Sequence, residues 1–155
     1  MSSPTPQIGF PMAFEQELQA LPHGREFRFV EKMISLTPGQ EGVAEYQITG
    51  EEEFLKGHFP GRPLWPGVIM IEAIAQLGGV VAQSDPEIPA LDNMLLTSVK
   101  NAKILGSTTP GATLTIRAKV QGRLGSIIQI SGEVLDGDTK LASGIVMLSG
   151  TEKAG

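Results

Sequence analysis

One apolar segment, residues 68–82, constrains the fold more than any other part of the chain, and only Glu72 and Gln76 interrupt it with polar side chains. As a helix, this segment would span about 22 Å at ~1.5 Å per residue, which is short of the roughly 30 Å core of a bilayer. We therefore expect a helix enclosed in a globular core. Pro66 suits its first turn, because the missing N–H would have no intrahelical partner there. The expected helix covers residues 66–83 and is apolar on nearly all sides.

Alternating segments on the C-terminal side of this helix predict strands. In residues 113–120, apolar side chains alternate with Thr, Arg and Lys, so one face should be buried and the other exposed. Residues 126–135 and 140–148 follow, separated at residues 136–138 by Asp-Gly-Asp, which suits a tight hairpin turn. Weaker candidates are strands at residues 28–35, 43–48 and 95–104 and a short helix at residues 13–20. These elements predict an α+β fold in which a long central helix is wrapped by a curved antiparallel sheet.

Length and composition indicate one globular domain. The chain has 155 residues, of which 41% are hydrophobic and 19% charged, and no repeat or linker divides it. We expect a flexible leader at residues 1–12, a single domain at residues 13–150 and a tail at residues 151–155. The N-terminus has no basic segment followed by an apolar one, so we expect a cytoplasmic protein that does not associate with membranes.

Charge and residue usage exclude several classes of function. The net charge is −5, the chain has no block of Lys and Arg, and only one Trp and one Tyr are available for stacking on bases. These features argue against nucleic acid as a partner. The absence of cysteine excludes thiol catalysis and thiolate metal sites.

The segment before the helix has the residue types of a preorganised site. Residues 57–67 contain three prolines and three glycines, which set a rigid path around His58. On the helix, at 100° per residue, Glu72, Gln76 and Gln83 fall within about 40° of one another. Taken alone, a histidine in such a loop is more often structural, and a helix carboxylate is more often a solvated group or a cap. Their combination on one short segment favours an acid–base pair.

Residues 57–76 have the sequence GHFPGRPLWPGVIMIEAIAQ. This segment resembles the active-site segment of the β-hydroxyacyl-acyl-carrier-protein dehydratases of fatty-acid synthesis, including the separation 72 − 58 = 14 between histidine and acid. A weaker similarity extends from Leu21 to the turn at residues 136–138. The resemblance implies the hot-dog fold and a homodimer with shared active sites, in which the histidine comes from one subunit and the acid from the other. In this family such dimers often assemble further into a hexamer, a trimer of dimers.

The resemblance also implies a mechanism, the dehydration of (3R)-3-hydroxyacyl thioesters to trans-2-enoyl thioesters. His58 is the expected base at C2, and Glu72 is the expected acid that protonates the departing 3-hydroxyl group. The N–H of Gly67 is expected to stabilise charge on the thioester carbonyl. The Leu64 carbonyl is expected to hold the imidazole, and Gln76 to orient the carboxyl group. No metal or redox cofactor is expected, since the phosphopantetheine of acyl carrier protein or coenzyme A carries the substrate.

Further positions have weaker assignments. Four apolar residues are expected to line or support an acyl tunnel, with ordinary core packing as the alternative for each: Phe59, Trp65, Val68 and Ile69. His23 lies in the Leu-Pro-His segment of the family, where we expect a structural role. Four basic residues are candidates for contact with phosphopantetheine or a carrier protein, with solvated surface charge as the alternative: Lys56, Arg62, Lys100 and Lys103.

The chain departs from the family pattern after the helix. Residues 100–112 keep Pro110-Gly111 but lack the basic cluster and the following aspartate of the family. Two other functions stay open: a hot-dog thioesterase, which would use the helix carboxylate as base or nucleophile, and a non-catalytic acyl-binding subunit. A dehydratase of a specialised acyl pathway also stays open.

Overall fold

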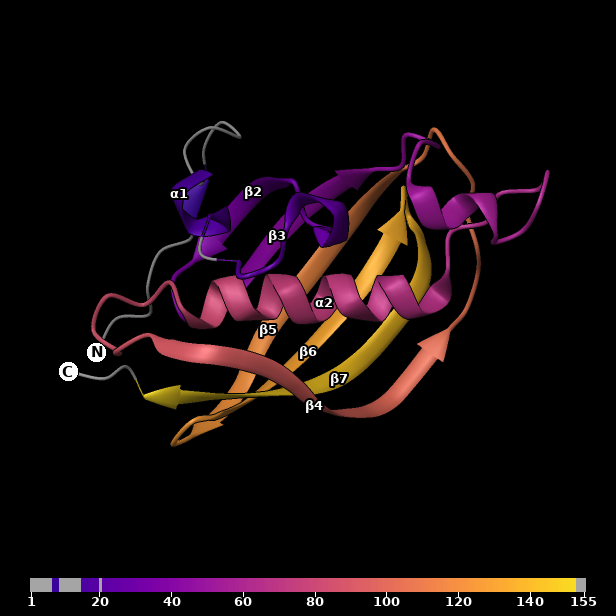
Figure 1. Ribbon diagram of the computed structural model, residues 1–155. Coiled ribbons are helices and arrows are strands. Elements are labelled where there is room, and N and C mark those ends of the chain that lie inside the picture. Colours follow the sequence, from indigo (N-terminus) through magenta and orange to yellow (C-terminus); the bar gives the residue numbers. More distant parts are fainter. Residues whose placement is uncertain (1–6, 9–14, 20, 153–155) are drawn as a thin grey trace.

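The computed structural model describes residues 7–8, 15–19 and 21–152. Its centre is helix α2, Gly67–Ala82, which lies across one face of a seven-stranded sheet (Figure 1). The sheet is antiparallel with strand order β1-β2-β3-β5-β6-β7-β4. The strands are β1 Gln7–Ile8, β2 Lys32–Thr37, β3 Glu41–Gln47, β4 Leu91–Ile104, β5 Thr113–Leu124, β6 Ile127–Asp136 and β7 Thr139–Glu152. Short helices lie at Glu15–Leu18 (α1), Arg25–Phe27 and Glu53–Lys56, the last two being 3₁₀ helices.

Helix α2 is enclosed because its apolar side chains face the sheet. Met70, Ile74, Leu77 and Val81 have no exposed surface, and the helix begins directly after Pro66, as expected. The helix and the sheet approach closely at Gly132 on β6, where an added Cβ would overlap the Ile74 side chain. This close contact places one face of α2 at a fixed height above the sheet.

The C-terminal strands follow the predicted alternation. In β5, Leu114, Ile116 and Ala118 are buried, while the residues between them are not. Strands β6 and β7 form the expected hairpin, in which Gly137 has a φ of 60°. The expected α+β fold, a long helix wrapped by a curved antiparallel sheet, is therefore confirmed.

Several element boundaries differ from the prediction. The short helix expected at residues 13–20 is restricted to Glu15–Leu18 within the described residues. The strand expected from residue 28 begins at Lys32, because the backbone of residues 27–29 bonds to the Gln76 side chain instead of a strand. Gln7–Ile8, placed in the leader, pair with β2, and residues 151–152, placed in the tail, end β7. The rest of the leader and tail lies outside the described residues.

Strand β4 forms one edge of the sheet and is long and bent. Its pairing with β7 shifts register at three places, and Asn93 and Asn101 have positive φ. Such irregularities let a strand curve around a helix. The large apolar side chains that β4 exposes include Leu95, Leu96, Val99 and Ile104.

Over the described ranges, no helix combines the length and apolar character that a bilayer crossing requires.

Candidate active site

His58 lies in a tight loop between the 3₁₀ helix Glu53–Lys56 and α2. Phe59 and Arg62 exchange backbone hydrogen bonds of 3.0 and 2.8 Å across this loop. The Leu64 N–H donates to the His58 carbonyl at 2.8 Å, and the Leu64 carbonyl lies 2.7 Å from His58 Nδ1. A carbonyl can only accept, so Nδ1 carries a proton, and in the neutral tautomer Nε2 keeps the lone pair. The expected contact between Leu64 and the imidazole is present, and it gives His58 the tautomer of a general base.

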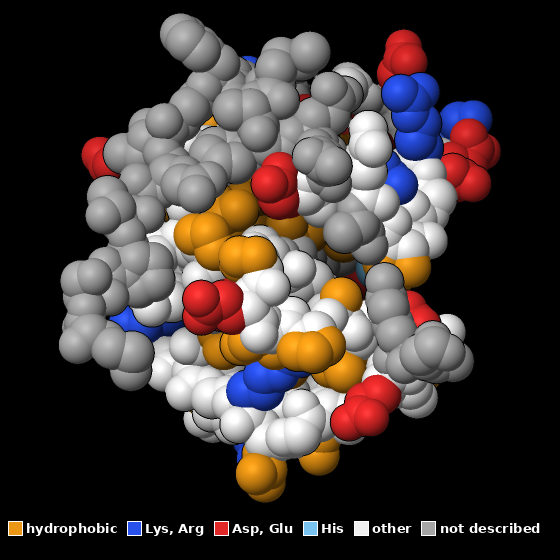
Figure 2. Space-filling model, turned by 90° about the vertical axis from the view of Figure 1, so that its left-hand side faces the viewer, with side chains coloured by type: hydrophobic (Ala, Val, Ile, Leu, Met, Phe, Trp, Pro, Cys, Tyr) orange, Lys and Arg blue, Asp and Glu red, His pale blue; other side chains and the backbone are white. Residues whose placement is uncertain are grey.

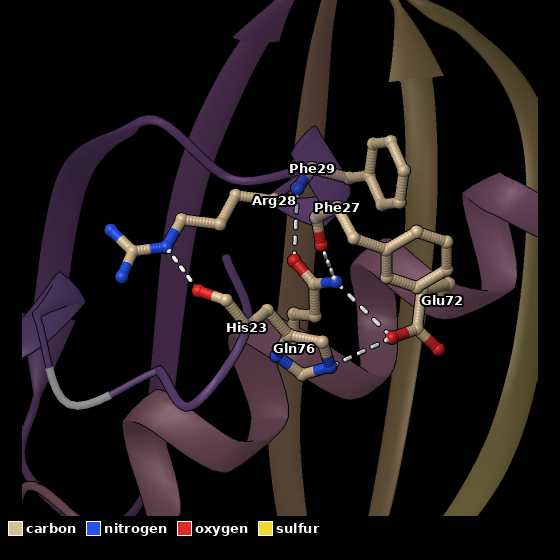
Figure 3. Close-up of polar contacts among 6 residues, drawn as sticks. All are labelled: His23, Phe27, Arg28, Phe29, Glu72 and Gln76. Atoms are coloured by element: carbon tan, nitrogen blue, oxygen red, sulfur yellow. Dashed lines mark hydrogen bonds and ion pairs between the residues drawn. The ribbon is translucent and has the colours of Figure 1, made fainter. Parts of the chain in front are cut away.

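Glu72 lies on the second turn of α2, where two side chains hold the same carboxyl oxygen (Figure 3). Gln76 Nε2 lies 3.1 Å from Glu72 Oε1, and His23 Nε2 lies 3.2 Å from that atom. The Glu72 side chain is 19% exposed, so the carboxyl group is partly shielded from solvent but reachable. The expected contact between Gln76 and Glu72 is therefore present.

Gln76 is itself held in one orientation by backbone groups. Its Oε1 accepts the Phe29 N–H at 2.9 Å, and its Nε2 donates to the Phe27 carbonyl at 2.8 Å (Figure 3). A flipped amide would set donor against donor and acceptor against acceptor. The network therefore directs the second N–H of Gln76 at Glu72.

Gly67 is the first residue of α2. Its N–H belongs to the first turn, where amide groups have no intrahelical acceptor and the helix dipole is positive. An added Cβ at Gly67 would lie 2.8 Å from the Ile104 side chain, so the backbone approaches β4 closely here. This position agrees with the expected role of Gly67, which stays a prediction.

An apolar groove extends along α2 from Glu72. Its volume is about 130 Å³, and six residues of one helix face line it: Glu72, Ala75, Gln76, Gly79, Val80 and Gln83. The opposite walls come from residues 21–23, Met94, Leu95, Leu96 and Leu148. At the far end, Gln83 bonds to both backbone groups of Leu91, at 2.7 and 3.0 Å. Figure 2 views the end of the molecule near the C-terminal end of α2 and shows hydrophobic patches exposed between charged side chains.

The structure brings some predicted site residues together and keeps others apart. Glu72, Gln76 and His23 form one contact network, and His58 and Leu64 form another. His58 is not among the residues that line the groove beside Glu72. The groove alone therefore does not bring His58 and Glu72 into one site.

The four expected tunnel residues have different environments. Trp65 is buried in an aromatic cluster, with ring centroids 5.9, 5.3 and 5.2 Å from those of Phe29, Tyr46 and Phe54. For Trp65 the structure thus shows core packing, the alternative named for it. Phe59 is exposed and stacks on the His58 ring at 4.3 Å, Val68 is exposed, and Ile69 is partly buried against the core.

The basic candidates lie at the surface. Lys56 pairs with Glu53 at 3.0 Å on the same 3₁₀ helix, and Arg62 is exposed in the loop after His58. Lys100 and Lys103 are exposed on β4, the edge strand. None of the four belongs to the contact network around Glu72 (Figure 3).

A partly buried pair, Tyr46 and Glu52, supports the loop that precedes His58. The Tyr46 hydroxyl donates to Glu52 at 3.1 Å, and burial raises the pKa of Tyr46 above its usual value. Burial alone would also raise the pKa of Glu52, but hydrogen bonds from the N–H groups of Thr49, Glu52 and Gly50 outweigh it and hold that pKa below its usual range. Glu52 thus stabilises the turn as a carboxylate.

The contact between His23 and Glu72 is the one that sequence reasoning missed. We expected a structural role, and the structure places its imidazole on the carboxyl group of Glu72. The two residues are 72 − 23 = 49 positions apart, so no local spacing connects them. The Leu-Pro-His segment was the only available signal.

Comparison with solved structures defines the class of fold. A dehydratase heterocomplex, ApeI:P from Xenorhabdus doucetiae, matches with a TM-score of 0.72 and 18% identity over 86% of this chain and 89% of that one. The zebra fish thioesterase superfamily member 2 matches with a TM-score of 0.65 and 13% identity over 90% and 94%. At these identities the similarity shows the fold alone, and it confirms the hot-dog fold. The protein is thus a hot-dog protein in which the central helix carries Glu72 and the loop before that helix carries His58.

Sequence comparison identifies the family. The model of the FabA-like domain family matches residues 21–144. The 3-hydroxyacyl-[acyl-carrier-protein] dehydratase FabZ of Clostridium acetobutylicum is 35% identical over 128 residues, covering 79% of this chain and 90% of the relative. FabZ of Anaplasma phagocytophilum is 36% identical over 117 residues, covering 74% and 81%. The chain therefore belongs to the FabA-like dehydratase family, which confirms the resemblance of residues 57–76.

Proposed function

We propose that this protein dehydrates (3R)-3-hydroxyacyl thioesters, carried on acyl carrier protein, to trans-2-enoyl thioesters in fatty-acid biosynthesis. The observation that carries the proposal is the pair of held groups, His58 with its Nδ1 on the Leu64 carbonyl and Glu72 in the lining of an apolar groove. The FabZ relatives are named for this activity, as 3-hydroxyacyl-[acyl-carrier-protein] dehydratases. An apolar groove beside an acid is what an acyl chain with a 3-hydroxyl group requires.

The proposed reaction proceeds by general acid–base catalysis. His58 Nε2 removes the C2 proton, and the Gly67 N–H stabilises the charge that develops on the thioester carbonyl. Glu72 protonates the 3-hydroxyl group, which leaves as water while the C2–C3 double bond forms. The reaction leaves His58 protonated and Glu72 ionised, and proton return through solvent resets the pair. No metal or redox cofactor takes part in these steps.

We further propose that the site is completed in a homodimer. His58 and Glu72 belong to separate contact networks within one chain, and β4 exposes apolar side chains along an unpaired sheet edge. Pairing of two β4 edges would cover this surface and join the sheets. His58 of one subunit would then serve with Glu72 of the other, and three such dimers could form a hexamer.

The carrier partner follows from the proposed substrate. Acyl carrier protein and coenzyme A both present the acyl chain on phosphopantetheine, and Lys56, Arg62, Lys100 and Lys103 are the proposed contacts for its phosphate or for acidic carrier side chains. The four lie at the surface, where such a partner can reach them. The cytoplasmic location stays a prediction.

Hydration of crotonyl-coenzyme A tests the proposed activity. The conjugated enoyl thioester absorbs in the ultraviolet, and its hydrated product does not. We expect loss of absorbance without release of thiol, abolished by His58→Ala and by Glu72→Gln. Thiol release would contradict the proposal and favour a thioesterase. Absence of turnover, both here and with a longer chain on acyl carrier protein, would favour a non-catalytic acyl-binding subunit.

A further inference from the structure

We propose that His23 is a positioning residue for the acid Glu72. Its Nε2–H, together with the Gln76 amide, occupies Glu72 Oε1 and confines the transferable proton to Oε2. This inference rests on the proposed function, in which Glu72 is the acid.

The two contacts converge on one oxygen from different parts of the chain. Gln76 approaches Oε1 from the next turn of α2, at 3.1 Å, and His23 approaches from the segment before β2, at 3.2 Å. In Figure 3 the second carboxyl oxygen points away from both donors. A proton on Oε1 would face two N–H groups, whereas a proton on Oε2 leaves Oε1 free to accept both. The carboxylic acid therefore has one favourable place for its proton.

The surroundings of His23 favour a proton on Nε2. Nδ1 is buried, and it has no hydrogen-bond partner in the described part of the chain. A proton on Nδ1 would be a buried N–H without an acceptor there, which costs more than an unused lone pair. With the proton on Nε2, the ring can donate to Glu72.

The backbone around His23 is anchored to the same network. Arg28 Nε donates to the His23 carbonyl at 2.8 Å, and the His23 ring stacks on the Phe27 ring with centroids 6.0 Å apart. The Phe27 carbonyl in turn accepts from Gln76. The imidazole is thus held relative to Glu72 by contacts at both its backbone and its ring.

A comparison of two leaving groups, water and chloride, distinguishes a positioning role of His23 from an effect of its substitution on folding. A 3-hydroxybutyryl thioester must receive a proton from Glu72 before water leaves. A 3-chlorobutyryl thioester needs only His58, because chloride departs with the C3–Cl electron pair while the C2–H pair forms the double bond. Both substrates give the same crotonyl thioester, followed by its absorbance. The ratio of the two rates within one variant does not depend on the amount of folded enzyme.

We expect His23→Phe, which keeps a ring on Phe27 but has no donor, to lower the ratio of water loss to chloride loss by about ten- to a hundredfold. His23→Leu lacks the donor as well and serves if the Phe variant does not fold. His23→Gln, whose amide can donate from a similar place, should retain most of the ratio. His58→Ala should lose both reactions, and its residual chloride loss gives the uncatalysed background.

The outcomes distinguish the inference from the proposed function. If Glu72→Gln lowers the ratio and the His23 variants that lack a donor lower it as well, the positioning role is supported. If Glu72→Gln lowers it but His23→Phe and His23→Leu slow both substrates equally or neither, His23 is only structural and the inference is wrong. If Glu72→Gln leaves the ratio unchanged, Glu72 is not the acid and the proposed mechanism fails first.

Discussion

At the scale of single residues, the site depends on a buried amide that holds a carboxyl group. Gln76 is 2% exposed and connects Glu72 to the backbone at Phe27 and Phe29. Gln83, the C-cap residue of α2, makes a similar pair of bonds to Leu91, about two turns further along the same helix face. Both amides satisfy backbone groups, but only Gln76 touches the proposed acid.

Replacement of the two amides therefore separates stability from activity. Gln76→Leu leaves the buried Phe29 N–H without its acceptor, so we expect the free energy of unfolding to fall by about 1–3 kcal/mol and dehydration to slow as well. Gln83→Leu should cost a similar amount of stability while activity on short substrates is kept. Urea unfolding and turnover of both variants measure the two effects, and equal loss of activity would contradict the assignment.

Glu52 makes a pH-dependent contribution to stability. Its pKa in the folded protein is lowered, so its stabilisation is present above the unfolded value of about 4.3 and is lost as the pH falls through the folded value. We expect Glu52→Gln to lower the melting temperature at pH 7, and the difference from the unmodified protein to shrink as the pH falls below about 4.3. A difference that does not change with pH would show that the carboxylate charge is not what stabilises the turn.

At the scale of elements, glycines set how α2 lies on the sheet. An added Cβ at Gly132 would overlap Ile74 and approach the Arg117 carbonyl, whereas an added Cβ at Gly122 on β5 would meet nothing within 4 Å. We expect Gly132→Ala to destabilise the fold by about 1–3 kcal/mol, since overpacking costs this much, and Gly122→Ala to have a much smaller effect. Thermal unfolding of both variants checks this, and equal effects would refute the close approach of helix and sheet.

Gly79 is one of the residues that line the groove along α2. An added Cβ there would lie 3.6 Å from Leu148, an ordinary contact, so alanine fits. Because alanine favours helix over glycine by about 1 kcal/mol, Gly79→Ala should raise the melting temperature. The same methyl group enters the proposed acyl groove, so turnover of long chains should fall more than that of crotonyl thioester. Unchanged chain-length preference would place the acyl chain elsewhere.

At the scale of the whole molecule, strand β4 is an edge of the sheet that a second chain could pair with. Val99 lies on β4 and is 47% exposed, whereas Gln121 is exposed on β5, away from this edge. We expect Val99→Lys to weaken the proposed dimer and to reduce activity with it, and Gln121→Lys to do neither. Light scattering during size-exclusion chromatography gives the mass, and an active monomer would contradict the shared site.

Local features of the site could be predicted from the sequence, and distant ones could not. The contacts of His58 with Leu64 and of Glu72 with Gln76 lie within 20 residues of chain, where a loop of prolines and a regular helix determine the geometry. Strand β5 was predictable because its alternation reports one buried face. The His23 contact joins segments 49 positions apart, so it depends on how the whole chain folds.

The environment of Trp65 also had to come from the tertiary structure. Its aromatic neighbours Phe29, Tyr46 and Phe54 come from three other segments, so core packing and tunnel lining could not be distinguished by position. The start of β2 was misplaced for a similar reason, since the Gln76 side chain takes the backbone bond of Phe29. In both cases side chains from distant segments decide the outcome.

Mixing two inactive variants tests most directly whether His58 and Glu72 form one acid–base pair across a dimer. His58→Ala and Glu72→Gln subunits, unfolded and refolded together in equal amounts, should give about half mixed dimers, each with one intact site of two. We predict that crotonyl thioester hydration returns to about a quarter of the unmodified rate, while each variant refolded alone stays inactive. Hydration that does not return, although mixed dimers form, would contradict the account.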